Sequence, residues 1–135
     1  MRIVVLLLTC LLLLHCKSVK KNSTVSVDEL IQEHFEGKAQ VHYNESKSFA
    51  LCWSSYKGTL LKPGNSLDYG IIDVSAKKMV YREQKYNATV EWVNDTIVKV
   101  KSNPGVRSKD EQINRAMALY YINVRTLEKS TDLDL

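Results

Sequence analysis

The stretch VEWVNDTIVKVK, residues 90–101, decides the fold class of this chain. Apolar and polar residues alternate over 90–93 and again over 97–101, with Asn, Asp and Thr between the two runs. This period of two is typical of β-strands that bury one face. The stretch therefore predicts an antiparallel β-hairpin, and with it a chain built mainly of β-structure.

The register of this hairpin follows from matching its apolar faces. A two-residue turn would place Val90 opposite Lys99 and mismatch the faces. A three-residue loop ending at Thr96 places Val90 opposite Val100 instead, and Glu91 opposite Lys99, as a cross-strand pair of opposite charge. We therefore predict the three-residue loop, although such loops usually have glycine at the position that Thr96 occupies.

Working outward, similar strand signals recur along most of the chain. They lie at residues 39–43, 47–56, 69–74, 78–86 and, downstream, 117–126. Pro-Gly-Asn and Asn-Pro-Gly motifs punctuate the loops between them. Residues 69–78 and 120–129 are similar to one another, and each predicts a strand followed by a turn. The predicted fold class is mainly β (α+β), with one short N-terminal helix and an antiparallel meander of about six to seven strands.

A helix signal precedes the first strand. Ser26 and Glu29 have the spacing of a capping box, in which each side chain accepts a hydrogen bond from the backbone N–H of the other residue. Leu30, Ile31, His34 and Phe35 then fall on one helical face. We expect a short helix that packs its apolar face on the sheet.

The segment before the last strand supports two interpretations. Residues 113–121 have apolar positions at helical spacing, and Ser108 and Glu111 could form a capping box. Residues 120–124, in contrast, have strand composition. We favour a strand over 117–126 that follows a polar loop, with the helix as the open alternative.

The N-terminus has the organisation of a signal peptide. Arg2 supplies a positive charge, residues 3–14 form an almost unbroken apolar run, and the run ends before Cys16. A membrane-spanning helix needs about 20 apolar residues, and the polar residues 17–24 end this run well before that length. The pattern predicts a leader that is removed on export.

The string LLLLHCKSVKKNST, residues 11–24, resembles the lipobox and tether of bacterial lipoproteins. In that family the cysteine at the cleavage site is diacylated and becomes the mature N-terminus. Leu13 matches the usual aliphatic residue of the motif, whereas His15 replaces the usual small residue. Cys10 is a competing candidate, but cleavage there would leave an apolar mature terminus. The short leader followed by Cys-Lys-Ser is similar to small lipoproteins of the Bacteroidota, and we take Cys16 as the lipidation site.

This resemblance implies an address and a domain organisation. The predicted parts are a signal peptide (1–15), a lipidated tether (16–25), one β-rich domain (26–129) and a frayed tail (130–135). Two or three acyl chains on one cysteine anchor a protein durably, and the lysines after Cys16 would face lipid head groups. The expected location is the cell envelope, anchored to the inner or outer membrane, with the domain in the periplasm or at the cell surface.

Charge and composition bear on possible partners. The chain has 135 residues, with 19 Lys and Arg against 15 Asp and Glu, and a formal net charge of +4. Basic residues lie close to acids along much of the chain, which is typical of a solvated surface rather than of a nucleic-acid-binding face. We expect no nucleic-acid partner and no cofactor. The expected partners are the membrane, through the lipid anchor, and an envelope protein or glycan.

Candidate chemical sites in the domain are few. Cys52 lies in an apolar strand, where cysteine behaves as a small hydrophobic residue. His34 and His42 lack the spacing of metal ligands. The aromatic residues could line a recognition surface but are more typical of a core. Asp-Thr-Ile at Thr96 resembles an O-glycosylation motif of exported Bacteroidota proteins, which makes Thr96 a candidate glycosylation site.

Two functions of different class are compatible with these observations. The first is a non-enzymatic binding or envelope-accessory domain on a membrane anchor. The alternative is a small periplasmic hydrolase or redox protein with a site assembled from scattered residues. We favour the first, because no catalytic motif is recognisable in the sequence.

Overall fold

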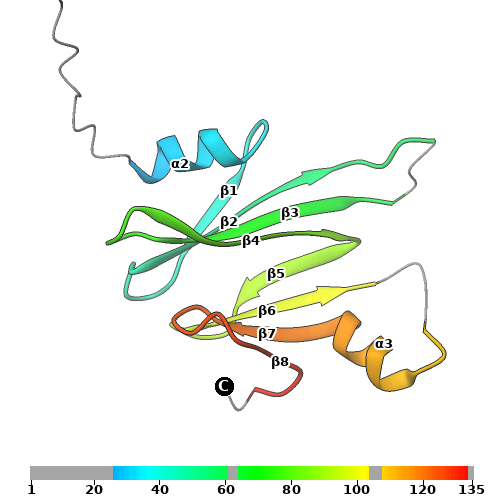
Figure 1. Cartoon of the computed structure of the whole chain (residues 1–135). Coiled ribbons are helices and arrows are strands. Elements are labelled where there is room, and N and C mark those ends of the chain that lie inside the picture. Colours follow the sequence, from blue (N-terminus) through cyan, green and yellow to red (C-terminus); the bar gives the residue numbers. More distant parts are fainter. Residues whose placement is uncertain (1–25, 61–63, 104–107, 134–135) are drawn as a thin grey trace, which may run out of the picture.

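The computed structural model describes residues 26–60, 64–103 and 108–133, so the predicted leader and Cys16 lie outside the described residues. The described chain is mainly β, as predicted, with two antiparallel sheets of four strands each and two short helices. In Figure 1 helix α2 lies above the first sheet, the second sheet lies below it, and helix α3 lies at the right-hand end of the second sheet. The described residues form eight strands, close to the prediction of about six to seven.

Each sheet is a simple meander in which sequential strands are neighbours. The first sheet contains β1 (Gln40–Tyr43), β2 (Phe49–Tyr56), β3 (Ser66–Asp73) and β4 (Lys78–Tyr86). The second contains β5 (Ala88–Trp92), β6 (Ile97–Ser102), β7 (Leu119–Asn123) and β8 (Lys129–Ser130). Ser130 is thus the last residue of β8 rather than the first residue of a tail.

The main core lies between the two sheets. Alternate residues of each strand point inward, as the period of two requires. The first sheet contributes Leu51, Leu67, Tyr69 and Ile71, and the second contributes Val90, Val98, Val100, Tyr120, Ile122 and Val124. All ten are buried, so this seam supplies most of the hydrophobic stabilisation of the fold.

Helix α2 (Val27–His34) covers the outer face of the first sheet, as the sequence predicted. Its capping box is formed: the Glu29 N–H donates to the Ser26 hydroxyl at 3.1 Å, and the Ser26 N–H donates to the Glu29 carboxylate at 2.8 Å. Leu30, Ile31 and Phe35 pack on Ala50, Cys52 and Ile72 in a second hydrophobic cluster. The central strands β2 and β3 of the first sheet are therefore buried on both faces.

The β5–β6 hairpin has the predicted register. Val90 pairs with Val100 and Glu91 pairs with Lys99, whose ammonium lies 2.7 Å from the Glu91 carboxylate. The loop needs no glycine, because the Asn94 side-chain oxygen accepts backbone N–H groups of the loop at 2.8 and 2.9 Å. An asparagine turn of this kind replaces the left-handed residue that was expected.

A β-bulge in β4 determines which of its side chains point into the core between the two sheets. Ile71 pairs with Tyr81 and Ile72 pairs with Met79, so Val80 is an extra residue. Such a bulge changes the face that the following residues present. Met79 consequently packs in the cluster under α2, whereas Val80 and Tyr81 pack against the core between the sheets.

The favoured interpretation of the segment before β7 is wrong in part. Residues Glu111–Ala118 form helix α3, and the strand begins at Leu119. The helix is capped by Asp110 rather than Ser108: the Asp110 carboxylate accepts the Gln112 N–H at 2.8 Å. The helix was missed because it continues into the strand without a loop. The strand composition around Tyr120 and Tyr121 was therefore assigned to the end of the helix as well.

The chain passes from the first sheet to the second at Asn87. This single residue between β4 and β5 has a positive φ of 48°, which asparagine tolerates better than most residues. Its side-chain oxygen accepts the Asn65 N–H at 3.0 Å, and its carbonyl accepts the Asn103 N–H at 3.1 Å. The corner between the sheets is thus fixed to the loops on either side of it.

Candidate binding site beside helix α3

The carboxylate of Glu83 joins both sheets at the β4 edge. Its Oε2 accepts the hydroxyl of Tyr69 at 2.6 Å, that of Tyr120 at 2.8 Å and that of Tyr81. Lys129 donates to the same oxygen at 3.1 Å. These donors come from β3, β4, β7 and β8, so one carboxylate oxygen connects strands of both sheets. We call these five residues the Glu83 cluster.

A count of protons shows that all three hydroxyl donors of this cluster are in use. The Tyr69 and Tyr120 hydroxyl oxygens also lie 2.8 Å apart, so three hydroxyl protons serve four contacts. Each tyrosine carries one donor, and at any time one of the four contacts lacks a proton. Glu83 Oε2 has no lone pair left for a substrate, which makes it unsuitable as a general base.

The pKa shifts agree with this structural role. Burial alone would raise the pKa of Glu83, but the hydrogen bonds from Tyr69, Tyr81, Tyr120 and Lys129 outweigh it and lower the pKa. Burial and the bond to Glu83 raise the pKa of the Tyr69 hydroxyl. An ionised glutamate among neutral tyrosines is therefore the stable state near neutral pH, far from the matched pKa that acid–base catalysis needs.

Two lysines, Lys129 of the cluster and its neighbour Lys85, lie on the solvent side of Glu83. Lys85 Nζ lies 3.1 Å from Glu83 Oε1, and the ammoniums of Lys85 and Lys129 lie 5.3 and 5.0 Å from the centre of the Tyr120 ring. Their side chains are 28% and 43% exposed. An ammonium has three donors, so both lysines keep N–H groups that can reach a ligand.

A groove of about 350 Å³ adjoins these lysines and runs along helix α3. Ile113, Met117 and Tyr120 form its apolar part, and Lys85 and Lys129 lie in its wall. Ile113 is 48% exposed and Met117 is 42% exposed, and helix α3 has no buried residue. Two large apolar side chains are thus exposed beside ammonium groups, which makes this groove a candidate binding surface.

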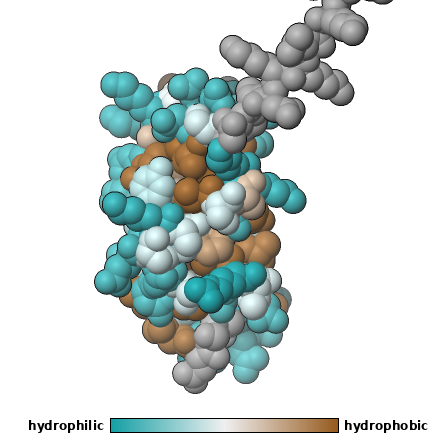
Figure 2. Space-filling view, turned by 90° about the vertical axis from the view of Figure 1, so that its left-hand side faces the viewer, coloured by the Kyte–Doolittle hydropathy of each residue, from teal (hydrophilic) through white to brown (hydrophobic). Residues whose placement is uncertain are grey.

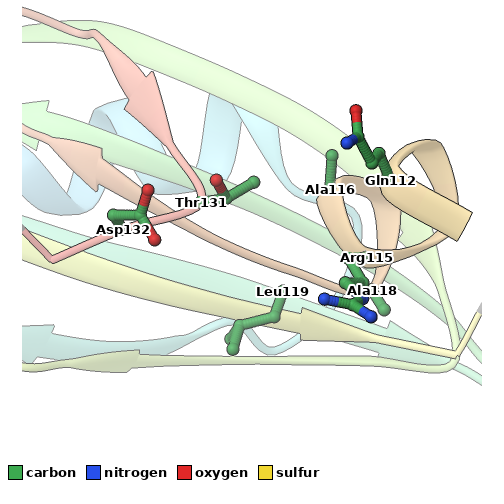
Figure 3. Close-up of a pocket in the computed structure, with 7 residues that line it drawn as sticks. All are labelled: Gln112, Arg115, Ala116, Ala118, Leu119, Thr131 and Asp132. Carbon is green, nitrogen blue, oxygen red and sulfur yellow. The ribbon is translucent and has the colours of Figure 1, made fainter.

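A second groove of about 630 Å³ lies next to the first and shares Ala116 and Thr131 with it. In Figure 3 Thr131 and Asp132, from the segment after β8, lie across from the α3 residues Gln112 and Ala116. Its wall carries both charges, Arg115 and Asp132, which offset one another. We call the two adjoining hollows together the helix groove.

A further hollow, of about 330 Å³, lies on the α2 side of the first sheet. There Arg82 contacts Asp68 at 2.6 Å and lies 5.4 Å from the centre of the Phe35 ring. The Tyr56 hydroxyl donates to the Glu36 carbonyl at 3.0 Å. These polar groups bond to one another, so this hollow is a weaker candidate than the helix groove.

The end of the molecule that carries the turns is partly apolar as well. Figure 2 shows hydrophobic side chains open to this end, with hydrophilic side chains around them. Val93 and Leu127, in two of the turns, are 41% and 38% exposed. Charged residues of both signs lie in the same turns, so this end has no clear charge preference.

The structure does not bring Cys52, His34 and His42 together into one site. Cys52 is fully buried under α2, and burial raises the pKa of its thiol to about 12. His42 pairs with Leu51 on the opposite face of the first sheet, where its ring lies 4.8 Å from that of Trp53. His34 is in the last turn of α2. Within the described ranges, no three His, Cys, Asp or Glu residues are placed to share a metal ion.

Thr96, the candidate glycosylation residue, lies in the β5–β6 loop. It is half-buried, and its hydroxyl donates to the Asn94 side chain at 3.2 Å. Its carbonyl accepts the Val124 N–H at 2.9 Å, which ties the loop to the neighbouring hairpin. Nothing in this geometry tests glycosylation, which stays a prediction.

Sequence reasoning missed the Glu83 cluster. Glu83 is 37 residues from Tyr120 and 46 residues from Lys129, and no local spacing connects them. The only signal was the similarity of 69–78 to 120–129, each of which begins with a tyrosine of the cluster.

Comparison with protein families, curated proteins and solved structures finds no match to this chain. Among the described residues, neither helix has the length and apolar character needed to cross a membrane.

Proposed function

We propose that this protein is an exported lipoprotein that is anchored to a cell-envelope membrane through Cys16 and carries a non-enzymatic binding domain. The observation that carries the proposal is the apolar run over residues 3–14, which is followed by His15 and Cys16. Such a run is too short to span a bilayer and has the length of a signal-peptide core. The expected partner is an envelope protein or glycan.

The start of the domain supports the anchoring part of the proposal. Helix α2 begins directly after its cap Ser26, so residues 17–25 separate the domain from Cys16. A chain spans at most about 3.5 Å per residue, which limits the domain to roughly 30 Å from an anchored cysteine. A partner would therefore be bound close to the membrane surface.

The binding part is supported by the side chains that are exposed and those that are buried. Cys52 is enclosed under α2, and Oε2 of Glu83 is occupied by the donors of its own cluster, so neither group is well placed to react with a ligand. Ile113 and Met117, in contrast, are open to solvent beside two ammonium groups. The burial of Cys52 leaves the alternative function, a hydrolase or redox protein, without an accessible thiol among the described residues.

The anchoring part is tested by replacing Cys16 with Ala in the full chain. The Cys16→Ala variant is expected to leave the membrane fraction or to keep its leader, because no other residue can accept the acyl chains at that cleavage site. Cys10→Ala is the matched control, and it is expected to fractionate like the unaltered protein. Unchanged membrane fractionation and processing of Cys16→Ala would contradict the proposal.

A further inference from the structure

We propose that the smaller hollow of the helix groove, which Lys85 and Lys129 line, binds a single-chain anionic amphiphile, a molecule with one acyl chain and a carboxylate or phosphate group. This inference deepens the proposed binding role of the domain by naming the site and the ligand class. It does not depend on the anchor at Cys16.

The apolar part of the ligand follows from helix α3. Ile113 and Met117 are one helical turn apart, so they lie on the same face of α3, and both line the smaller hollow with Tyr120. The volume of that hollow, about 350 Å³, is at the lower end of the range of about 300–1,000 Å³ for small-molecule sites. One acyl chain therefore fits better than the two chains of a membrane phospholipid.

The anionic group follows from the two lysines. Lys85 and Lys129 are the charged residues that line the smaller hollow, and both are cationic. Glu83, which contacts both lysines, lies behind them with a side chain only 22% exposed. A ligand in the groove therefore meets ammonium groups first. The cluster also fixes both lysines in place, which lowers the entropy that binding would otherwise cost.

Photo-crosslinking in whole cells that produce the full chain tests the inference. The probe is a twelve-carbon carboxylic acid with a diazirine on its chain, and the matched neutral probe is the corresponding alcohol. Mass spectrometry is expected to place the acid adducts on α3 and β7. The alcohol is expected to label these residues at least about tenfold less, since a hydrogen bond to a charged group contributes about 1.5–3 kcal/mol, or roughly 10- to 150-fold.

Matched variants locate the site. Met117→Asp is expected to abolish the adducts, whereas Val93→Asp, at a similarly exposed position on the turn end, is expected to leave them unchanged. Lys85→Gln and Lys129→Gln are each expected to lower labelling about tenfold, whereas Lys78→Gln on the same strand as Lys85 is not. Circular dichroism checks folding, and if the Lys129 variant unfolds, Lys85→Gln decides the point.

Several outcomes would overturn the inference. These are equal labelling by the alcohol, adducts outside the groove, and no effect of either lysine variant. Equal labelling by a two-chain phospholipid probe would assign the surface to the bilayer, and displacement by an acidic peptide that exceeds displacement by dodecanoate would assign it to a protein partner. Adducts in the groove together with unchanged membrane fractionation of Cys16→Ala would reject the anchor alone. Altered fractionation of Cys16→Ala without adducts in the groove would reject the groove alone.

Discussion

Glu83 is an acidic side chain whose role is structural. A half-buried carboxylate is costly unless hydrogen bonds replace its lost water, and here three tyrosines and two lysines do so. The same contacts join the first sheet to the second at an edge where the second sheet ends in the two-residue strand β8. We therefore regard the cluster as the polar closure of the sandwich on that side.

Glu83→Gln is expected to lower the free energy of unfolding by about 1–3 kcal/mol at pH 7. The side-chain amide places its own N–H donors against the hydroxyl donors of the tyrosines. The substitution also removes the negative charge that Lys85 and Lys129 contact. Urea unfolding measures the change. Glu91→Gln is the control, because that exposed pair with Lys99 is expected to contribute nothing measurable. Equal stability of Glu83→Gln and the unaltered protein would contradict the assigned role.

The pH dependence of this difference has a definite sign. The pKa of Glu83 is lowered in the folded state, so its stabilisation is complete above the ordinary glutamate pKa near 4.5. As the pH falls below that value, the unfolded state takes up the proton first and the stabilisation is lost. The difference in free energy of unfolding between the unaltered protein and Glu83→Gln should therefore decrease as the pH falls below about 5.

Cys52 is expected to be inert in the folded protein. Its pKa of about 12 leaves roughly one thiolate in 10⁴ at pH 8, and α2 covers the sulfur. A thiol reagent at pH 8 should modify Cys52, identified by peptide mass spectrometry, only as fast as the protein unfolds. Rapid modification without urea would show that α2 opens readily or that the thiol is exposed.

At the scale of elements, the turns of the two sheets use the same device. Asp73 in the β3–β4 turn accepts the Ala76 N–H at 2.8 Å, and Asn123 in the β7–β8 turn accepts the Arg125 N–H at 3.0 Å. Four residues after each lies a residue with positive φ, Lys77 at 50° and Leu127 at 62°. These turns explain why the similar stretches 69–78 and 120–129 form equivalent hairpins, one in each sheet.

The two helices are expected to respond differently to loss of their caps. Asp110→Ala removes a cap worth about 1 kcal/mol, and since α3 has no buried residue, its amides should exchange about fivefold faster without a change in global stability. Ser26→Ala is the matched control: α2 buries Leu30 and Ile31, so its loss should appear in global unfolding. A fall in global stability with unchanged α3 exchange would contradict this view of α3.

Local pattern predicted the elements that local forces determine. The capping box at Ser26, the buried face of α2 and the register of β5–β6 all follow from short-range spacing, and each was predicted correctly. Helix α3 was not, because it runs directly into β7 and its apolar residues do not face a core. The bulge at Val80 was also missed, since it depends on how β4 meets its neighbour.

At the scale of the whole molecule, the division into two sheets depends on contacts that sequence pattern does not encode. The chain changes sheet at one residue, Asn87, within an almost continuous run of strand residues from 78 to 92. The Glu83 cluster likewise joins residues far apart in the chain. Pattern could predict the meander and the inward faces of α2 and of the β5–β6 hairpin, but not the pairing of the two sheets or the candidate groove.

The central claim, an export signal that ends at a lipidated Cys16, is tested most directly by mass spectrometry of the mature N-terminal peptide. We predict a polypeptide that begins at Cys16 and carries acyl chains on that residue. Residues 1–15 still attached, or an unmodified Cys16 at the terminus, would contradict it.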